Sequence, residues 1–207
     1  MRLLLPMMKS IYNRLSKLYN VYFLNDIKKL IKNYNCSYKF LSITDYAFLN
    51  HSGLPYKSFT YNEYLKESQN DKTLLAKDIL KNGMFFPFFG YIKDGQFYII
   101  LGKHRLYSLL LQYKKQPFNN KFLFIIFPSD FLRKSKKHEQ KQTMYKYDGQ
   151  ILTELFIVED KELVTVVDKF GFFLSNEIFQ FNKEHKEQIK PSLILNDEEL
   201  FKQFLEQ

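Results

Sequence analysis

Apolar residues recur every three or four positions in the first part of the chain, in two blocks that run from Met8 to Leu18 and from Leu24 to Ile31. Lysine and arginine side chains fill positions on the opposite faces. This spacing is typical of amphipathic helices and predicts two helical segments within residues 7–34. A basic amphipathic helix can lie on a membrane surface. A helix that packs its apolar face on a core has the same pattern, and we favour that interpretation.

The segment between residues 72 and 128 has the clearest succession of elements. Asp94-Gly95 between two apolar runs is a strong signal for a two-residue β-hairpin. Gly83 is expected to end a helix in the left-handed conformation, and Pro87 to mark a strand start or a sheet edge. The order helix, hairpin, helix, strand predicts an α/β protein of the α+β type with a small mixed sheet. The predicted elements are, in chain order, a helix over residues 72–82, strands over 84–91 and 96–101, a helix over 103–113 and a strand over 122–127.

The sequence on both sides of this segment predicts extensions. Residues 39–46 have the pattern of a short strand. Residues 131–147 are rich in charge and form the best candidate boundary. Their basic run, 133–138, fits either contact with nucleic-acid phosphates or a solvated linker. A second hairpin is expected from the apolar runs 151–158 and 163–167.

The end of the chain has the pattern of a capped helix. Asn196 stands three residues before Glu199, which is the spacing of a capping box, and apolar residues follow to Leu205. These features divide the chain into three predicted parts. They are an N-terminal helical extension packed on the core over residues 1–70, a core over residues 71–130, and a C-terminal α+β extension over residues 131–207.

The composition is that of a globular protein, with 45% hydrophobic and 26% charged residues in 207. The formal net charge of +9 suits polyanionic partners, although a lysine-rich composition gives the same charge without any partner. One cysteine, Cys36, excludes an internal disulfide framework, and the four histidines have no metal-site spacing. No stretch approaches about 18 consecutive apolar residues. We therefore expect a cytoplasmic protein without a membrane span.

The candidate chemistry lies where the strand over residues 97–101 meets the following helix at Gly102. The first turn of a helix has N–H groups without intrahelical acceptors and the positive end of the helix dipole, and both attract phosphate. Glycine permits a sharp turn and the close approach of a ligand. Arg105 can hold two phosphate oxygens, Lys103 adds a point charge, and His104 can donate or shuttle a proton. The alternative is an ordinary helix start on the surface, where Arg105 forms a salt bridge.

The stretches Leu75–Phe88 and Asp94–Leu109 resemble the N-terminal domain of ParB and its relatives in the ParB/sulfiredoxin-like superfamily. That family combines a helix ending in glycine, a strand beginning near a proline, a hairpin, and a glycine–X–(His/Arg)–Arg motif that opens a helix. The resemblance covers roughly residues 72–127 of this chain. It implies a ParB/sulfiredoxin-like core for the small mixed sheet and its helices.

Members of this fold use the glycine–X–X–arginine turn to hold nucleotide phosphates. Some partition proteins bind and hydrolyse CTP there, free-serine kinases use ADP or ATP, and sulfiredoxins use ATP to repair an oxidised cysteine. The resemblance therefore implies ATP, ADP or CTP, with Mg²⁺, as the ligand of this chain. The residues that it places on the phosphates are Gly102, Lys103, His104 and Arg105, with Ser108 one helical turn after His104 in an assisting position.

Two positions depart from the pattern of the family. Sulfiredoxins have their essential cysteine where this chain has Lys103, which argues against sulfiredoxin activity. Partition proteins usually carry glutamate at that position, and serine kinases often have aspartate where this chain has Leu101. Both changes remove acidic Mg²⁺ ligands from the turn. A catalytic carboxylate must then come from elsewhere, and Glu63 and Glu67 are the candidates, with Asp45 and Asp71 nearby in the sequence.

Three functions are compatible with these features. The first is a protein that binds a nucleotide or a phosphorylated metabolite, with phosphotransferase or nucleotidase activity as its enzymatic form. The second is a ParB-like DNA-associated regulator, which the charge favours; the strand-like residues 151–174 disfavour it, because a helix-turn-helix should follow the nucleotide domain. The third is a non-catalytic interaction protein on the same fold. Residues 1–70 could add a wall to the substrate site or a homodimer surface.

Overall fold

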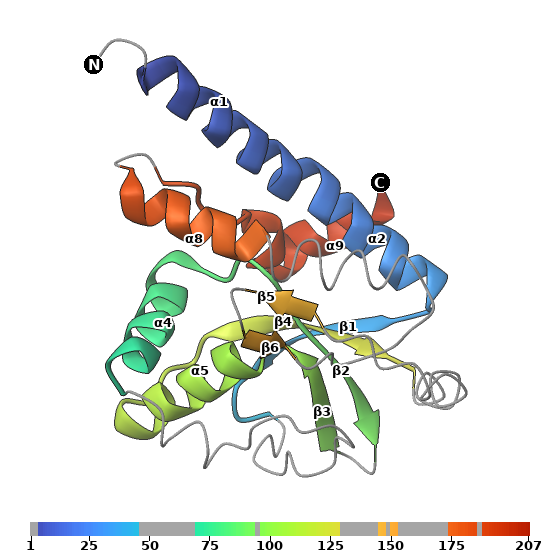
Figure 1. Cartoon of the computed structure of the whole chain (residues 1–207). Helices are drawn as coiled ribbons and strands as arrows, with labels where there is room; N and C mark the ends of the chain where they lie inside the picture. The colour runs from blue at the N-terminus through green and yellow to red at the C-terminus, as the bar shows by residue number, and fades with distance from the viewer. Residues whose placement is uncertain are drawn as a thin grey trace.

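The computed structural model describes residues 4–45, 69–93, 96–128, 145–147, 150–152, 174–185 and 188–207. In these residues the chain has a mixed α+β architecture, with helices packed on a small mixed sheet (Figure 1). Two apolar clusters lie on the two faces of the sheet. The predicted fold class is confirmed at this level.

The main sheet has four strands in the order β1-β4-β2-β3. β1 (Ser37–Ser42) pairs antiparallel with β4 (Lys121–Phe127). β4 runs parallel to β2 (Phe88–Lys93), which pairs antiparallel with β3 (Gln96–Leu101). Residues 122–127 of β4 are all buried, because helices cover both faces of the sheet at this central strand.

The strand predictions hold closely where local signals are strong. Lys93 lies opposite Gln96, so two residues connect β2 to β3, as the Asp-Gly pair predicted. β3 has its predicted bounds, and Pro87 directly precedes β2, in agreement with a strand start. β2 begins four residues later than expected, because residues 84–87 form an irregular connection instead.

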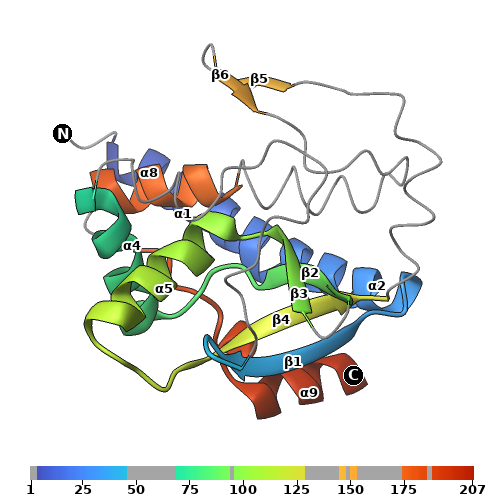
Figure 2. The same ribbon diagram turned by 90° about the horizontal axis from the view of Figure 1, so that it is seen from below.

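Two helices cover one face of the sheet. α4 (Gln69–Asn82) and α5 (Lys103–Lys115) lie side by side there, as Figure 2 shows. α4 starts three residues before its predicted position and ends at Gly83, whose φ of 93° is left-handed as expected. α5 continues two residues beyond its predicted end at Tyr113. Their apolar faces pack with Phe88, Phe97, Phe124 and neighbouring side chains in one cluster.

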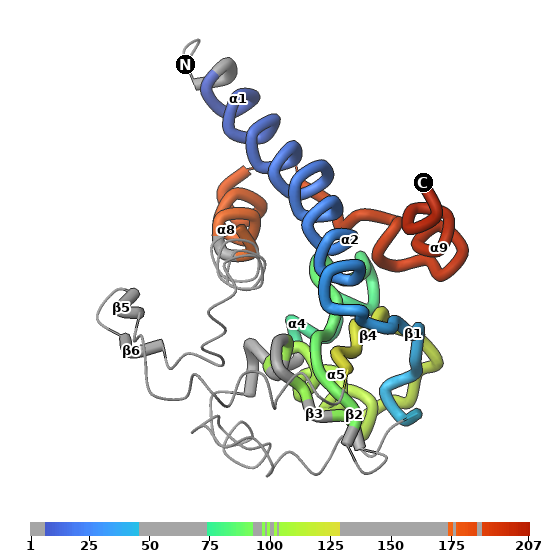
Figure 3. Tube along the Cα trace, turned by 90° about the vertical axis from the view of Figure 1, so that its right-hand side faces the viewer, coloured from blue at the N-terminus to red at the C-terminus, as the bar shows by residue number. Residues whose placement is uncertain are grey.

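The other face is covered by helices from both ends of the chain. α1 (Leu4–Lys17), the π-helix η1 (Leu18–Phe23) and α2 (Leu24–Asn33) form one continuous rod, whose N-terminal end extends beyond the other elements (Figures 1 and 3). The two predicted helices are therefore joined by a π turn. The buried side chains of Leu15, Tyr19 and Phe23 are four residues apart. The wider π turn keeps residues at this spacing on one side of the rod.

The C-terminal elements pack beside this rod. They are α8 (Ser175–Glu184), the 3-10 helix η3 (Leu193–Leu195) and α9 (Glu198–Glu206), and Figure 3 shows α8 and α9 on either side of the rod. The terminal helix was predicted, but its cap was not. The side chain of Asp197 accepts a hydrogen bond from the N–H of Leu200 over 3.0 Å, so Asp197 is the N-cap. The prediction that Asn196 is the cap is wrong, because the side chain of Asn196 bonds to a distant part of the chain.

A short hairpin begins at the end of the charged segment 131–147, the best candidate boundary in the sequence. β5 (Tyr145–Tyr147) pairs with β6 (Gln150–Leu152), with a second Asp-Gly pair between them in the sequence. The basic run 133–138 and the rest of the hairpin predicted from residue 151 onward lie outside the described residues.

Candidate functional site

The turn predicted from the sequence joins β3 to α5. β3 ends at Leu101, α5 starts at Lys103, and Gly102 between them has φ 107° and ψ 15°, in the left-handed region that favours glycine. A Cβ atom on Gly102 would lie 2.8 Å from Cδ1 of Phe88 and 3.0 Å from Nη2 of Arg105. Both the backbone conformation and the close packing therefore require glycine at this position.

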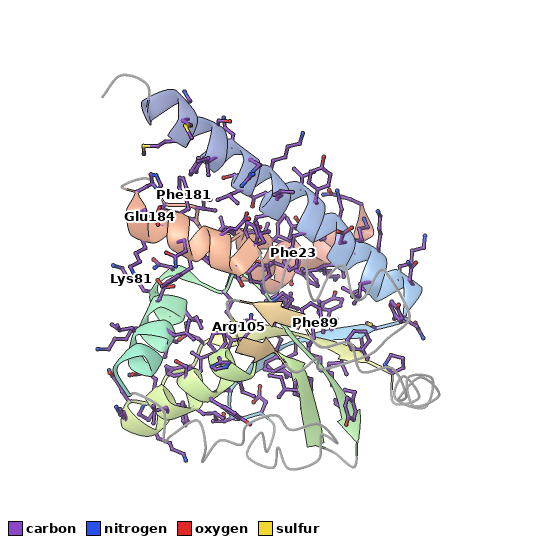
Figure 4. The ribbon with its side chains drawn as sticks, in the orientation of Figure 1. Phe23, Lys81, Phe89, Arg105, Phe181 and Glu184 are labelled. Carbon is purple, nitrogen blue, oxygen red and sulfur yellow. The ribbon has the colours of Figure 1, made fainter. Side chains whose placement is uncertain are left out.

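The side chain of Arg105 turns from α5 toward the connection between α4 and β2. Its Nη1 atom donates a hydrogen bond to the carbonyl oxygen of Phe86, and Nη2 donates to that of Pro87 over 3.2 Å. The guanidinium carbon lies 5.4 Å from the ring centroid of Phe88, within cation–π range. In the view of Figure 4, Arg105 lies near the middle, below Phe23 of the N-terminal rod. This arrangement differs from the surface salt bridge that the alternative interpretation expected.

The guanidinium of Arg105 keeps its positive charge. Burial lowers its pKa from 12.5 to about 10, so the guanidinium is still protonated at neutral pH. Its two hydrogen bonds end on neutral carbonyl oxygens, which satisfy donors without neutralising the charge. This half-buried cation lies in the first turn of α5, at the positive end of the helix dipole. An anion is favoured at such a place.

Residues 84–87, which we call the 84–87 segment, lie between α4 and β2 and belong to no helix or strand. Buried carbonyl groups need hydrogen-bond partners. Here four successive carbonyl oxygens each accept a hydrogen bond from a side chain. The donors are Asn196 to Met84, Tyr19 to Phe85, and Arg105 to both Phe86 and Pro87. Side chains from three distant parts of the chain therefore fix the backbone next to the turn.

The other residues predicted to contact phosphate lie at different depths. His104 is exposed in the first turn of α5. Ser108, one turn later, is fully buried, so the structure does not bring it to the surface that His104 occupies. Lys103 is the first residue of α5, and the position of its side chain lies outside the described part of the structure. Among the predicted residues with described side chains, His104 and Arg105 share the first helical turn with Gly102 before it.

Of the four candidate carboxylate residues, two lie within the part of the chain that the structure describes. Glu63 and Glu67 lie outside the described residues. The Oδ2 atom of Asp45 accepts a hydrogen bond from the N–H of Ser42 over 2.7 Å, in a local turn at the end of β1. Asp71 lies within α4. In the described ranges no group of three or more His, Cys, Asp or Glu side chains could hold a metal ion.

Sequence reasoning missed Tyr19 and Asn196. The helical pattern pointed to Leu18 as the last apolar position of the first predicted segment. Leu18 is only partly buried, and its neighbour Tyr19 in the π turn is fully buried. Asn196 was assigned to the cap of the last helix because of its spacing from Glu199. No local signal indicates that either side chain bonds to the 84–87 segment, since the partners lie 66 and 112 residues away.

Comparisons with known proteins add no family to this geometry. A scan against protein-family models, a search of curated proteins and a search of solved structures all find no match to the chain. Of the helices that the structure describes, none is both long enough and apolar enough to cross a membrane.

Proposed function

We propose that the protein binds the phosphate of a nucleotide or a phosphorylated metabolite at the N-terminal end of α5, through residues 102–105. The observation that carries this proposal is the charged guanidinium of the half-buried residue Arg105, whose hydrogen bonds end on neutral carbonyl oxygens. A phosphate oxygen would supply the negative charge that those carbonyls lack. A guanidinium has five N–H donors, so the two bonds to the 84–87 segment do not exhaust it.

The order of elements supports the further proposal of a ParB/sulfiredoxin-like core. α4 ends at Gly83, β2 starts after Pro87, β2 and β3 form a hairpin, and Gly102 opens α5. These are the features on which the resemblance depends, in the same order. With that core, the ligand is ATP, ADP or CTP with Mg²⁺, and the protein acts in the cytoplasm. If a phosphoryl group is transferred, His104 is the candidate proton carrier, and Glu63 and Glu67 are the candidate carboxylates.

A second candidate function is a non-catalytic interaction protein on the same fold. The observation that favours it is the same pair of hydrogen bonds from Arg105 to Phe86 and Pro87. A protein without a phosphate ligand would still need these bonds, because they satisfy two carbonyl groups of the 84–87 segment. The arginine alone therefore does not distinguish the two functions, and a direct binding experiment is needed.

The experiment uses the variant His104→Glu. It places a carboxylate in the first turn of α5, where negative charge is favourable for the helix and unfavourable for a bound phosphate. His104 is exposed, so the substitution leaves the buried contacts of Arg105 in place. Gln116→Glu is the matched control, since Gln116 is exposed at the opposite end of α5 and undergoes the same charge change.

Binding is measured by thermal shift and calorimetric titration with ATP, ADP, CTP, GTP and inorganic phosphate, with and without Mg²⁺. A ligand at 100 times its dissociation constant should stabilise the wild type and Gln116→Glu by about 2.7 kcal/mol. His104→Glu should bind the same ligand at least about tenfold more weakly. Absence of binding by the wild type would overturn the proposal and favour the interaction protein. Equal binding by all three proteins would place the ligand elsewhere.

A further inference from the structure

Tyr19 reaches the 84–87 segment from the π-helical turn of the N-terminal rod. Its hydroxyl donates a hydrogen bond to the carbonyl of Phe85 over 2.9 Å and accepts one from the N–H of Ser192 over 2.9 Å. Its ring meets those of Phe85 and Phe86 edge-on, with centroids 5.3 and 5.8 Å away. π turns are rare and occur frequently at functional sites. Here the π turn delivers a fully buried polar group to the backbone beside Arg105.

Asn196 holds the same segment from the C-terminal side. Its Oδ1 atom accepts a hydrogen bond from the N–H of Met84 over 2.6 Å, and its Nδ2 atom donates to the carbonyls of Met84 and Ser192 over 2.9 Å each. Ser192 thus bonds to Asn196 through its carbonyl and to Tyr19 through its N–H. The two side chains and the 84–87 segment form one connected network.

We propose that Tyr19 and Asn196 are positioning residues for the phosphate-binding turn of residues 102–105. They fix the 84–87 segment, and the segment fixes the guanidinium of Arg105. The inference rests on the proposed phosphate site. Through these contacts the N-terminal rod and the C-terminal segment influence the phosphate affinity of a turn to which neither contributes a residue.

The physical basis is preorganisation. A long arginine side chain loses rotamer freedom when it binds a ligand, and this loss weakens binding. If the carbonyls of Phe86 and Pro87 already hold the guanidinium, the loss occurs during folding instead. Burial raises the pKa of Tyr19 above its ordinary value, so its hydroxyl stays protonated and can donate to Phe85.

The test is the variant Tyr19→Phe, which removes one oxygen atom and keeps the ring. Inorganic phosphate should bind this variant about threefold to tenfold more weakly than the wild type, the range that one hydrogen bond accounts for. The second measurement is the ¹⁵N-edited NMR spectrum of the arginine side chains. The Nη signals of Arg105, assigned by their loss in Arg105→Lys, should be resolved in the wild type and averaged by rotation in Tyr19→Phe.

The matched control is Tyr38→Phe. The ring of Tyr38 packs against Phe201 at 5.0 Å at the edge of the same apolar cluster, and the variant removes the same atom. Phosphate affinity and the Arg105 signals should match the wild type in this control. A general loss of stability would lower the midpoint of unfolding in both variants without changing the guanidinium spectrum of either.

The outcomes separate this inference from the proposed function. If the wild type binds phosphate, and Tyr19→Phe binds equally well with resolved Arg105 signals, the inference is overturned and the phosphate site stands. If the wild type binds neither phosphate nor nucleotides, the proposed function is overturned, and with it the role in ligand binding. Averaged Arg105 signals in Tyr19→Phe would in that case still establish that Tyr19 positions the guanidinium.

Discussion

Asn196 binds both backbone polar groups of Met84, although 112 residues separate the two in the chain. The contact joins the segment before α9 to the end of α4. Gly83 makes room for it, because a Cβ atom there would lie 2.9 Å from Cγ of Asn196. The glycine therefore serves both the helix end, where φ is 93°, and the docking of the C-terminal segment.

Asn196→Ala should lower the free energy of unfolding by about 2–4 kcal/mol, since three hydrogen bonds are lost and partly buried backbone groups lose their partners. Urea denaturation followed by circular dichroism measures the change. Asn82→Ala is the control, because Asn82 is exposed and its side chain bonds only to Asp78, one turn earlier, among the described contacts. A cost no larger than that of the control would show that the contact with Met84 contributes little.

Gly102→Ala should destabilise the protein by about 1–3 kcal/mol, because a residue with a Cβ atom is strained at φ 107° and would contact the ring of Phe88. Thermal unfolding of the variant measures the cost. Repeating the substitution in a Phe88→Leu background separates the two causes. A smaller cost in that background identifies the steric contact, and an equal cost identifies the backbone strain.

Arg105→Met should cost about 1–3 kcal/mol, because the carbonyls of Phe86 and Pro87 lose their donor while much of the side-chain volume remains. Arg14→Met is the comparison. Arg14 is exposed and lies 3.7 Å from Glu177 in a surface ion pair, which is worth less than about 1 kcal/mol. Similar unfolding midpoints for the two variants in urea would mean that the bonds of Arg105 to the segment are not stabilising.

Cys36 should make stability depend on pH in alkaline solution. Burial raises the pKa of its thiol to about 12 from the ordinary value of 9.0. Because the folded value is the higher one, the contribution to stability is complete below about pH 9 and is lost as the pH rises toward 12. The measurement is the difference in free energy of unfolding between the wild type and Cys36→Ala at several pH values. This difference cancels the other titrating groups, which the two proteins share.

The wild type should lose stability relative to Cys36→Ala above about pH 9, by at most about 1.4 kcal/mol for each pH unit. The cavity left by the substitution adds an offset that does not change with pH. A constant difference up to pH 10 would show that the thiol ionises in the folded protein as readily as in the unfolded chain.

Local signals predicted the parts of the fold that neighbouring residues determine. The hairpin at Asp94-Gly95, the left-handed Gly83 and the sharp turn at Gly102 follow from backbone preferences of the residues themselves. The start of β2 was placed too early because residues 84–87 are apolar like a strand. Their carbonyls bond to side chains instead of a neighbouring strand, and no local pattern reveals that difference.

The same distinction applies to the candidate site. The turn of Gly102 into α5 could be predicted from the sequence, because it depends on the helix start alone. The direction of the Arg105 side chain could not be predicted in this way. Its side chain could have extended into solvent, and it turns inward because the carbonyls of Phe86 and Pro87 are presented to it.

The class of fold, the hairpin, and a glycine turn that opens a helix among basic residues could all be predicted from the sequence. These properties come from conformational preferences and apolar periodicity, which act over a few residues. The contacts that hold Arg105, the identity of the α9 cap, and the hydrogen bonds from Tyr19 and Asn196 to the 84–87 segment emerge only when the chain is folded. Those contacts join elements far apart in the chain, and their partners are set by how the terminal helices pack on the sheet.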